Sequence, residues 1–129
     1  MQRVYQFGPK GFRCIIWHQG ESDFWQSKEY YFDNLSAIIW QTRKDAGWNI
    51  PWFTAMATYV PGVGLSDTTR AGQKMLWDEG VSFQGPDTDQ WLEEYRDYDG
   101  TGIHFAPKGL KVHGEAWAKF IADYINSQY

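Results

Sequence analysis

The chain has 129 residues, a formal net charge of -4 at pH 7 and a single cysteine, so it has the size of one domain, residues 1–129, with room for a real core. Lysine and arginine never cluster beyond two residues, which argues against nucleic-acid binding, and Cys14 has no partner for an intramolecular disulfide. No stretch is long enough to span a membrane or has the apolar centre of a signal peptide, so we expect a soluble protein.

The first predicted strand is Cys14–Trp17, which follows a loop at Met1–Phe12. All its residues are apolar, which is typical of a strand in a parallel sheet that is covered on both faces. The polar segment His18–Asp23 comes directly after it. In open α/β sheets, ligands gather at the carboxyl edge, so this position predicts a site.

The middle of the chain alternates between helix and strand patterns. Apolar residues at helical spacing predict a helix from Glu29 that ends at Gly47, and Trp52–Thr58 reads as a second buried strand. The loop Tyr59–Asp67, with its proline and glycines, should lie at the carboxyl edge of the sheet.

A further helix is predicted up to about Glu79, capped by Ser66 or Asp67 and with Ala71 among its inward residues. A short strand is predicted at Val81–Gln84.

The acidic segment Asp87–Asp99 is interpreted as a solvated surface. The last predicted helix begins at Pro107, and its inward stripe includes Leu110 and Tyr124. Helices that alternate with apolar strands predict an α/β layered fold.

Two polar blocks should meet at the same edge of the sheet. The first is Trp17–Asp23, with the sequence Trp-His-Gln-Gly-Glu-Ser-Asp, and the second is Gly102–Phe105, followed by Pro107–Leu110. Together they resemble the carbohydrate acetylesterase branch of the SGNH hydrolases, the sialate O-acetylesterase-like and acetylxylan esterase-like proteins. The resemblance covers nearly the whole chain. It implies a three-layer flavodoxin-like fold with a mainly parallel sheet, and removal of acetyl groups from sugars.

The resemblance also implies roles for single residues. A serine hydroxyl attacks only when an imidazole takes its proton, and the oxyanion that forms needs fixed donors. By resemblance His104 is the base, and Gln19 and Gly20 belong to the block near the oxyanion. The alternative for Gln19 is an amide that braces the loop.

The sequence leaves several candidates for the acidic partner of His104. Related proteins place an aspartate three residues before the histidine, but here that position is Thr101, whose hydroxyl can orient the ring without supplying charge. Glu21 matches a glutamate that some acetylesterases of this kind use, and it is our first choice. Asp99 is the second.

The nucleophilic serine of the family has no counterpart before the first strand. We therefore expect the chain to correspond to the C-terminal portion of the domain, with a sheet that is incomplete at its N-terminal side. Ser22 is a weak candidate nucleophile, because the second glycine of a nucleophile elbow is absent. The chain alone should therefore be a poor esterase.

The remaining expectations concern ligands and partners. No spacing of His and Cys fits a metal site, and no cofactor is implied. The expected partner is an acetylated carbohydrate, not a nucleic acid or a membrane, and a homo-oligomer would cover an exposed sheet edge around Ile15 and Ile16. An alternative function, favoured by the 19% aromatic content, is a non-catalytic carbohydrate-binding or interaction remnant. Proteins of this family are often secreted or periplasmic, but the sequence leaves the compartment open.

Overall fold

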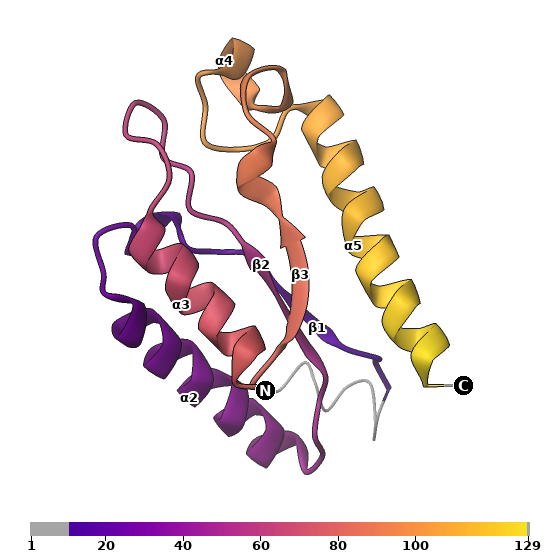
Figure 1. Ribbon diagram of the computed structural model, residues 1–129. Helices are drawn as coiled ribbons and strands as arrows, with labels where there is room; N and C mark the ends of the chain where they lie inside the picture. Colours follow the sequence, from indigo (N-terminus) through magenta and orange to yellow (C-terminus); the bar gives the residue numbers. More distant parts are fainter. Residues whose placement is uncertain (1–10, 129) are drawn as a thin grey trace.

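The computed structural model describes residues 11–128. Most of the predicted N-terminal loop, residues 1–10, lies outside the described part of the chain. Short 3-10 turns occur at Glu21–Asp23, Thr88–Gln90 and Glu93–Tyr95. Within residues 11–128 the strands and α-helices, drawn in Figure 1, are β1 (Ile15–Trp17), α2 (Lys28–Ala46), β2 (Trp52–Met56), α3 (Asp67–Asp78), β3 (Phe83–Asp87), α4 (Asp97–Gly100) and α5 (Pro107–Ser127).

The strands form one parallel sheet in the order β1-β2-β3. Ile15 pairs with Trp52 across the first ladder, and Phe53 pairs with Phe83 across the second. Figure 1 shows α2 and α3 together on one face of the sheet and α5 on the other. The fold is therefore the three-layer α/β arrangement that the sequence predicts, a partial flavodoxin-like sheet.

Side chains of β2 alternate between the two helical layers. Trp52 packs into a core cluster with residues of α2 and α3, whereas Phe53 and Ala55 pack against Trp117 of α5. Successive strand residues point to opposite faces. Both faces of β2 are covered, which explains why its sequence is apolar throughout rather than alternating.

Three helix boundaries follow the predicted capping chemistry. Gly47 ends α2 in the left-handed conformation, with φ of 73°, and its N–H donates to carbonyls of the last turn. The hydroxyl of Ser66 accepts a hydrogen bond from the Thr69 N–H at the start of α3. α5 begins at Pro107, where a backbone N–H would have no intrahelical partner. These predictions are confirmed.

The predicted strand at Val81–Gln84 is displaced. Val81 and Ser82 instead close the turn after α3, since both of their N–H groups donate to the carbonyl of Leu76. The strand β3 begins at Phe83 and runs through Gly85 and Pro86, two residues that are more usual in turns. β2 is also shorter than predicted and ends at Met56.

Three predictions about burial are wrong. Ala71 and Leu110 are exposed, although both were expected to face the core. In the first turn of α5 the buried position is Gly109, which packs against the backbone of Tyr95, and the next residue is turned about 100° away from it. Asp89, in the segment expected to be solvated, is 2% exposed.

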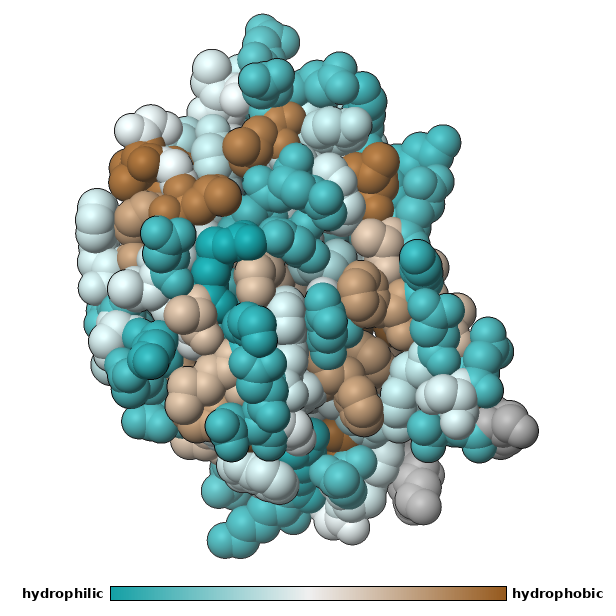
Figure 2. Space-filling model, in the orientation of Figure 1, coloured by the Kyte–Doolittle hydropathy of each residue, from teal (hydrophilic) through white to brown (hydrophobic). Residues whose placement is uncertain are grey.

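β1 lies at one edge of the sheet, and its Ile16 is 50% exposed. On the face drawn in Figure 2, hydrophobic side chains gather towards the end of the molecule where the strands finish. The loop after β2 contributes exposed apolar residues there, Val63 and Leu65. No helix within residues 11–128 has the length and apolar character needed to cross a bilayer.

Candidate active site

The polar block after β1 is fixed by the ends of three other elements. Gly20 is buried, and a Cβ at this position would collide with the carbonyl oxygen of Ala57, just beyond β2. The carbonyl of Gln19 accepts hydrogen bonds from the Tyr31 hydroxyl of α2, at 2.6 Å, and from the Gln73 side-chain amide of α3, at 3.2 Å. Glycine is therefore required at position 20 by close packing.

The two predicted oxyanion donors are engaged within this loop. The side-chain amide of Gln19 donates to the Asp23 carboxylate at 2.8 Å, and the N–H of Gly20 donates to the Glu21 carboxylate at 2.9 Å. The side chain of Gln19 lines a small cavity of about 80 Å³ beside α2. In this arrangement Gln19 braces the loop, although its side-chain NH₂ group has a second N–H beyond the one that bonds Asp23. The Gly20 N–H could bind an oxyanion only after the Glu21 carboxylate moved.

The second block is a closed turn between β3 and α5. Arg96 and Phe105 form an isolated antiparallel bridge, and the Asp97 N–H donates to the His104 carbonyl at 2.9 Å. Gly102 is buried, and a Cβ there would collide with the Asp97 carboxylate. The glycine therefore leaves room for the Asp97 side chain to fold beneath the turn that carries His104.

One pocket of about 440 Å³ joins the two blocks. His104 and Glu21, the predicted base and its first-choice acid, both line it. The first turns of α5 contribute as well, so the pocket is formed where β1, the His104 turn and α5 converge. Its polar lining consists of His18, Glu21, Ser22, Arg96, His104 and His113.

The carboxylate beside His104 belongs to a residue that the sequence did not single out. Asp97 Oδ2 lies 3.7 Å from His104 Nδ1, and the histidine side chain is 83% exposed. The other oxygen, Asp97 Oδ1, is buried and has no hydrogen-bond partner within residues 11–128. A carboxylate in this place can orient the imidazole and stabilise the positive charge that forms when the ring takes a proton.

The other acid candidates are placed differently. The Thr101 hydroxyl is exposed and donates to the carbonyl of Tyr98 at 2.7 Å. Asp99 lines a neighbouring cavity on the turn, as Asp97 also does, and neither residue lines the His104 pocket itself. Glu21 lines the pocket, but its carboxylate accepts the N–H of Gly20. In the described part of the chain, the ion pair that His104 makes within 4 Å is with Asp97.

Two further histidines form the inner wall of the pocket. His18 Nε2 lies 2.9 Å from the Thr88 hydroxyl, which itself donates to the Met56 carbonyl, so His18 is the donor. The Trp117 indole donates to His113 Nε2 at 2.8 Å. The two imidazole ring centroids are 4.8 Å apart. Each ring is thus held in one tautomer by a neighbour.

Burial favours the neutral form of both imidazoles. Burial lowers the pKa of His18. Burial also lowers the pKa of His113 to about 4, and the charges of His18 and Arg96 act in the same direction. From the sequence, His113 is expected to be a packing or surface residue; it packs, and in doing so lines the pocket.

Ser22 lies in the same pocket as His104, and its side chain is exposed. Within residues 11–128 its hydroxyl forms no hydrogen bond to an imidazole. A serine becomes a good nucleophile only when a base is placed to take its proton. The pocket therefore places Ser22 near His104 and Glu21, but without a hydrogen bond from its hydroxyl to an imidazole.

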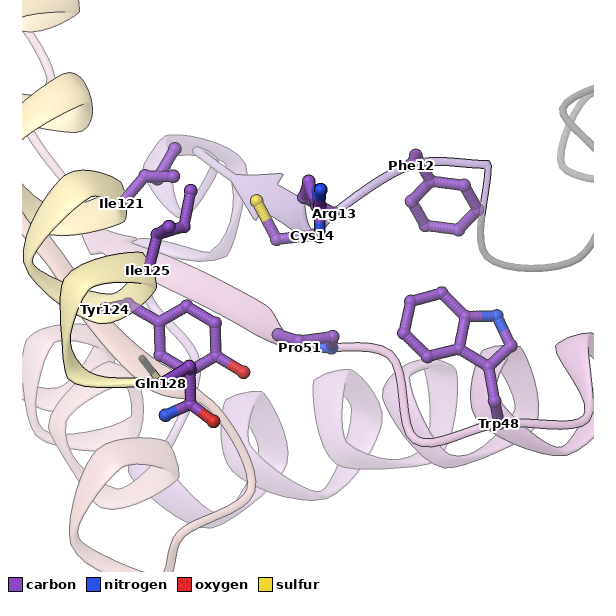
Figure 3. Close-up of a pocket in the computed structure, with 9 residues that line it drawn as sticks. All are labelled: Phe12, Arg13, Cys14, Trp48, Pro51, Ile121, Tyr124, Ile125 and Gln128. Carbon is purple, nitrogen blue, oxygen red and sulfur yellow. The ribbon is translucent and has the colours of Figure 1, made fainter.

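A second cavity, of about 260 Å³, lies at the opposite end of the sheet. Figure 3 shows Ile121, Tyr124 and Ile125 of α5 on one side of it and Cys14 facing them. Burial raises the pKa of the Cys14 thiol, which disfavours the nucleophilic thiolate. No group of three potential metal ligands occurs within residues 11–128. We therefore take the His104 pocket as the candidate active site.

Comparison with known proteins gives a family match over most of the chain. Residues 1–96 match the model of a family described as carbohydrate esterase, sialic acid-specific acetylesterase. None of the curated proteins and none of the solved structures matches the chain. The matched span covers about three quarters of the chain and includes the His18–Asp23 block, but it ends before His104.

Proposed function

The chain belongs to the carbohydrate esterase family of sialic acid-specific acetylesterases, and on that premise we propose that it forms the base side of a centre that removes O-acetyl groups from sialic acids. The single observation that carries the proposal is the pocket where His104 and Glu21 meet, with the Asp97 carboxylate 3.7 Å from the histidine ring. Acetylated xylan remains the second substrate class to test.

His104 is the proposed base of this centre. Its Nδ1 faces Asp97, which leaves Nε2 to take the proton of an attacking hydroxyl and then pass it to the departing sugar oxygen. We assign the acid role to Asp97 rather than Glu21, because the Asp97 carboxylate lies 3.7 Å from His104 Nδ1, whereas the Glu21 carboxylate is turned back onto the Gly20 N–H. Glu21 then serves to shape the opposite wall of the pocket.

The attacking hydroxyl is proposed to come from residues outside this sequence. Ser22 supports this assignment indirectly, because it lies in the pocket without a hydrogen bond to a base. The chain alone should then hydrolyse an O-acetylated sialic acid slowly. The turnover that remains should depend on His104, since a general base contributes about 10²–10⁴-fold to such reactions.

The experiment is a set of hydrolysis assays on O-acetylated sialic acid. His104→Ala should remove the slow turnover, whereas Ser22→Ala and the exposed control Lys119→Ala should leave it unchanged. A rapid turnover that Ser22→Ala abolishes would contradict the external nucleophile. Equal rates for wild type and His104→Ala would contradict the assignment of the base.

A second candidate, non-catalytic carbohydrate binding, is favoured by one observation. The Trp25 indole, which follows the first polar block, is 81% exposed, and an exposed aromatic ring can stack on a sugar. Under this candidate Trp25→Ala should weaken binding of acetylated and de-O-acetylated sialic acid alike. The esterase proposal instead requires the pocket to prefer the acetylated form.

A further inference from the structure

Arg96 is the most buried cation of the pocket, with 3% of its surface exposed. Its guanidinium donates to three backbone carbonyls, those of Trp91 at 2.7 Å, Ile103 at 2.7 Å and Thr88 at 3.1 Å. Burial of a charge is costly unless hydrogen bonds replace the lost water. Here the bonds tie together three points of the chain that follow β3.

The guanidinium also packs between two aromatic rings. Its carbon lies 4.3 Å from the ring centroid of Phe105 and 4.9 Å from that of Tyr59. The Tyr59 N–H donates to the buried Asp89 carboxylate at 3.0 Å. Through Tyr59 the side chain of Arg96 therefore reaches the end of β2, while through its carbonyl partners it reaches the end of β3.

The contacts of Arg96 fall on both neighbours of His104 in the chain. Its guanidinium donates to the carbonyl of Ile103 and stacks on the ring of Phe105. The backbones of Arg96 and Phe105 also pair with each other. Among residues 11–128, the polar side chain that approaches the His104 ring is Asp97, at 3.7 Å, and the histidine side chain is 83% exposed. The backbone on either side of the histidine, rather than its ring, is therefore what is fixed.

Lysine could not replace this side chain. A guanidinium is planar and spreads its N–H donors in a rigid fork, so it can stack on a ring and bond to carbonyls in several directions at once. The single ammonium of lysine keeps the charge but loses the stacking and most of the carbonyl contacts. Arg96→Lys thus separates the geometry of this residue from its charge.

We propose that Arg96 is the positioning residue for His104: it locks the turn that carries the histidine onto the ends of β2 and β3. The proposal rests on the proposed function for the role given to His104. Its test reads the position of the ring and not ester turnover, so failure of the enzymatic assays and failure of this proposal are distinguishable.

The experiment compares Arg96→Lys with a matched control, Arg43→Lys. Arg43 also uses its guanidinium to bind backbone carbonyls, those of Ile50 and Val81, but at the opposite end of the sheet. Two quantities are measured by NMR on the full chain. They are the hydrogen exchange rate of the Asp97 amide, which donates to the His104 carbonyl, and the ¹⁵N shifts of the His104 ring.

In Arg96→Lys the Asp97 amide should exchange about 10- to 100-fold faster, because hydrogen bonds to a charged donor are lost locally. The His104 ring shifts should move towards those of Asp97→Asn. Amides of β2 should keep their wild-type rates, which excludes a merely global loss of stability. Arg43→Lys should change neither the exchange rate of the Asp97 amide nor the ¹⁵N shifts of the His104 ring.

Unchanged Asp97 exchange and His104 shifts in a folded Arg96→Lys variant would overturn the proposal, as would an equal change in Arg43→Lys. If Arg96→Lys does not fold, the Asp97 exchange rate is measured in Tyr59→Leu instead. This change removes one stacking ring without touching the His104 turn, and it should accelerate Asp97 exchange in the same sense by a smaller factor. No change in Tyr59→Leu would then refute the role of Arg96.

Discussion

Replacing Asp89 by asparagine should destabilise the protein more than any other single-atom change at the carboxyl edge of the sheet. The Asp89 side chain is 1% exposed and pairs with Arg70 at 2.7 Å. Its carboxylate also accepts hydrogen bonds from the N–H and hydroxyl of Thr58, both at 2.7 Å, and from the Tyr59 N–H at 3.0 Å. An amide offers only one acceptor oxygen to these donors, and its NH₂ group faces the rest of them.

Removing one partner of a buried ion pair costs about 3–5 kcal/mol. Arg70 retains both of its hydrogen bonds to Asp87 and is 24% exposed, so the lower end of that range applies. We therefore expect Asp89→Asn to lower the free energy of unfolding by about 3 kcal/mol. That is a large share of the roughly 5–15 kcal/mol typical of a domain.

The assay is urea denaturation, with the m-value as the check that the unfolding transition stays comparable. The matched control is Asp87→Asn, whose side chain is 40% exposed and pairs with the same arginine. This control should cost about 1 kcal/mol, since solvent screens its charge. A loss of less than about 1 kcal/mol for Asp89→Asn, or a loss no greater than that of the control, would refute this reasoning.

Three more predictions concern packing, pH dependence and self-association. Gly20→Ala should cost about 1–3 kcal/mol in urea denaturation, because the new Cβ meets the carbonyl oxygen of Ala57; wild-type stability would contradict the packing described. Burial lowers the pKa of His113 from 6.5 to about 4, so the unfolded state binds more protons in that window and stability should fall as the pH drops from 6.5 to 4. His113→Gln, which keeps an acceptor for Trp117, should flatten this dependence, and an unchanged slope would count against it. We also propose that the edge of β1 self-associates, so sedimentation should show dimers that Ile16→Lys dissociates, whereas a wild-type monomer at all concentrations would exclude this.

The sequence predicts the elements well where one local signal decides. The apolar run before His18 specifies β1, and Gly47 and Pro107 mark the ends of their helices because their backbone preferences act within a single turn. Gly85 and Pro86 mislead for the same reason. They are usual in turns, but here they are buried in β3 because tertiary packing outweighs local preference.

The composition of the site is harder to read from the sequence. The two polar blocks indicate which segments meet, and the pocket brings His104 and Glu21 together. Asp97 was missed because a tight turn returns it to the histidine, and that turn needs positive φ at Tyr98, Asp99 and Gly100. Sequence spacing alone does not predict that such a turn brings Asp97 back to the histidine.

Buried polar networks are the second feature that the sequence does not predict. Asp89 belongs to a run of acidic residues that looks like a solvated surface, and its contacts with Thr58, Tyr59 and Arg70 distinguish it from the exposed acidic residues of that run. Arg96 is hidden in the same way, since its partners are backbone carbonyls, which every residue has. Their importance comes from position in the fold and not from residue type.

The most direct test of the account is an NMR titration of the chain with O-acetylated sialic acid, followed at the His104 ring and the Glu21 amide. If the pocket is the base side of an acetylesterase centre, both signals should shift saturably, and de-O-acetylated sialic acid should shift them less at the same concentration. The account would be contradicted by shifts confined to the Cys14 cavity at the other end of the sheet, or by no shifts with millimolar ligand.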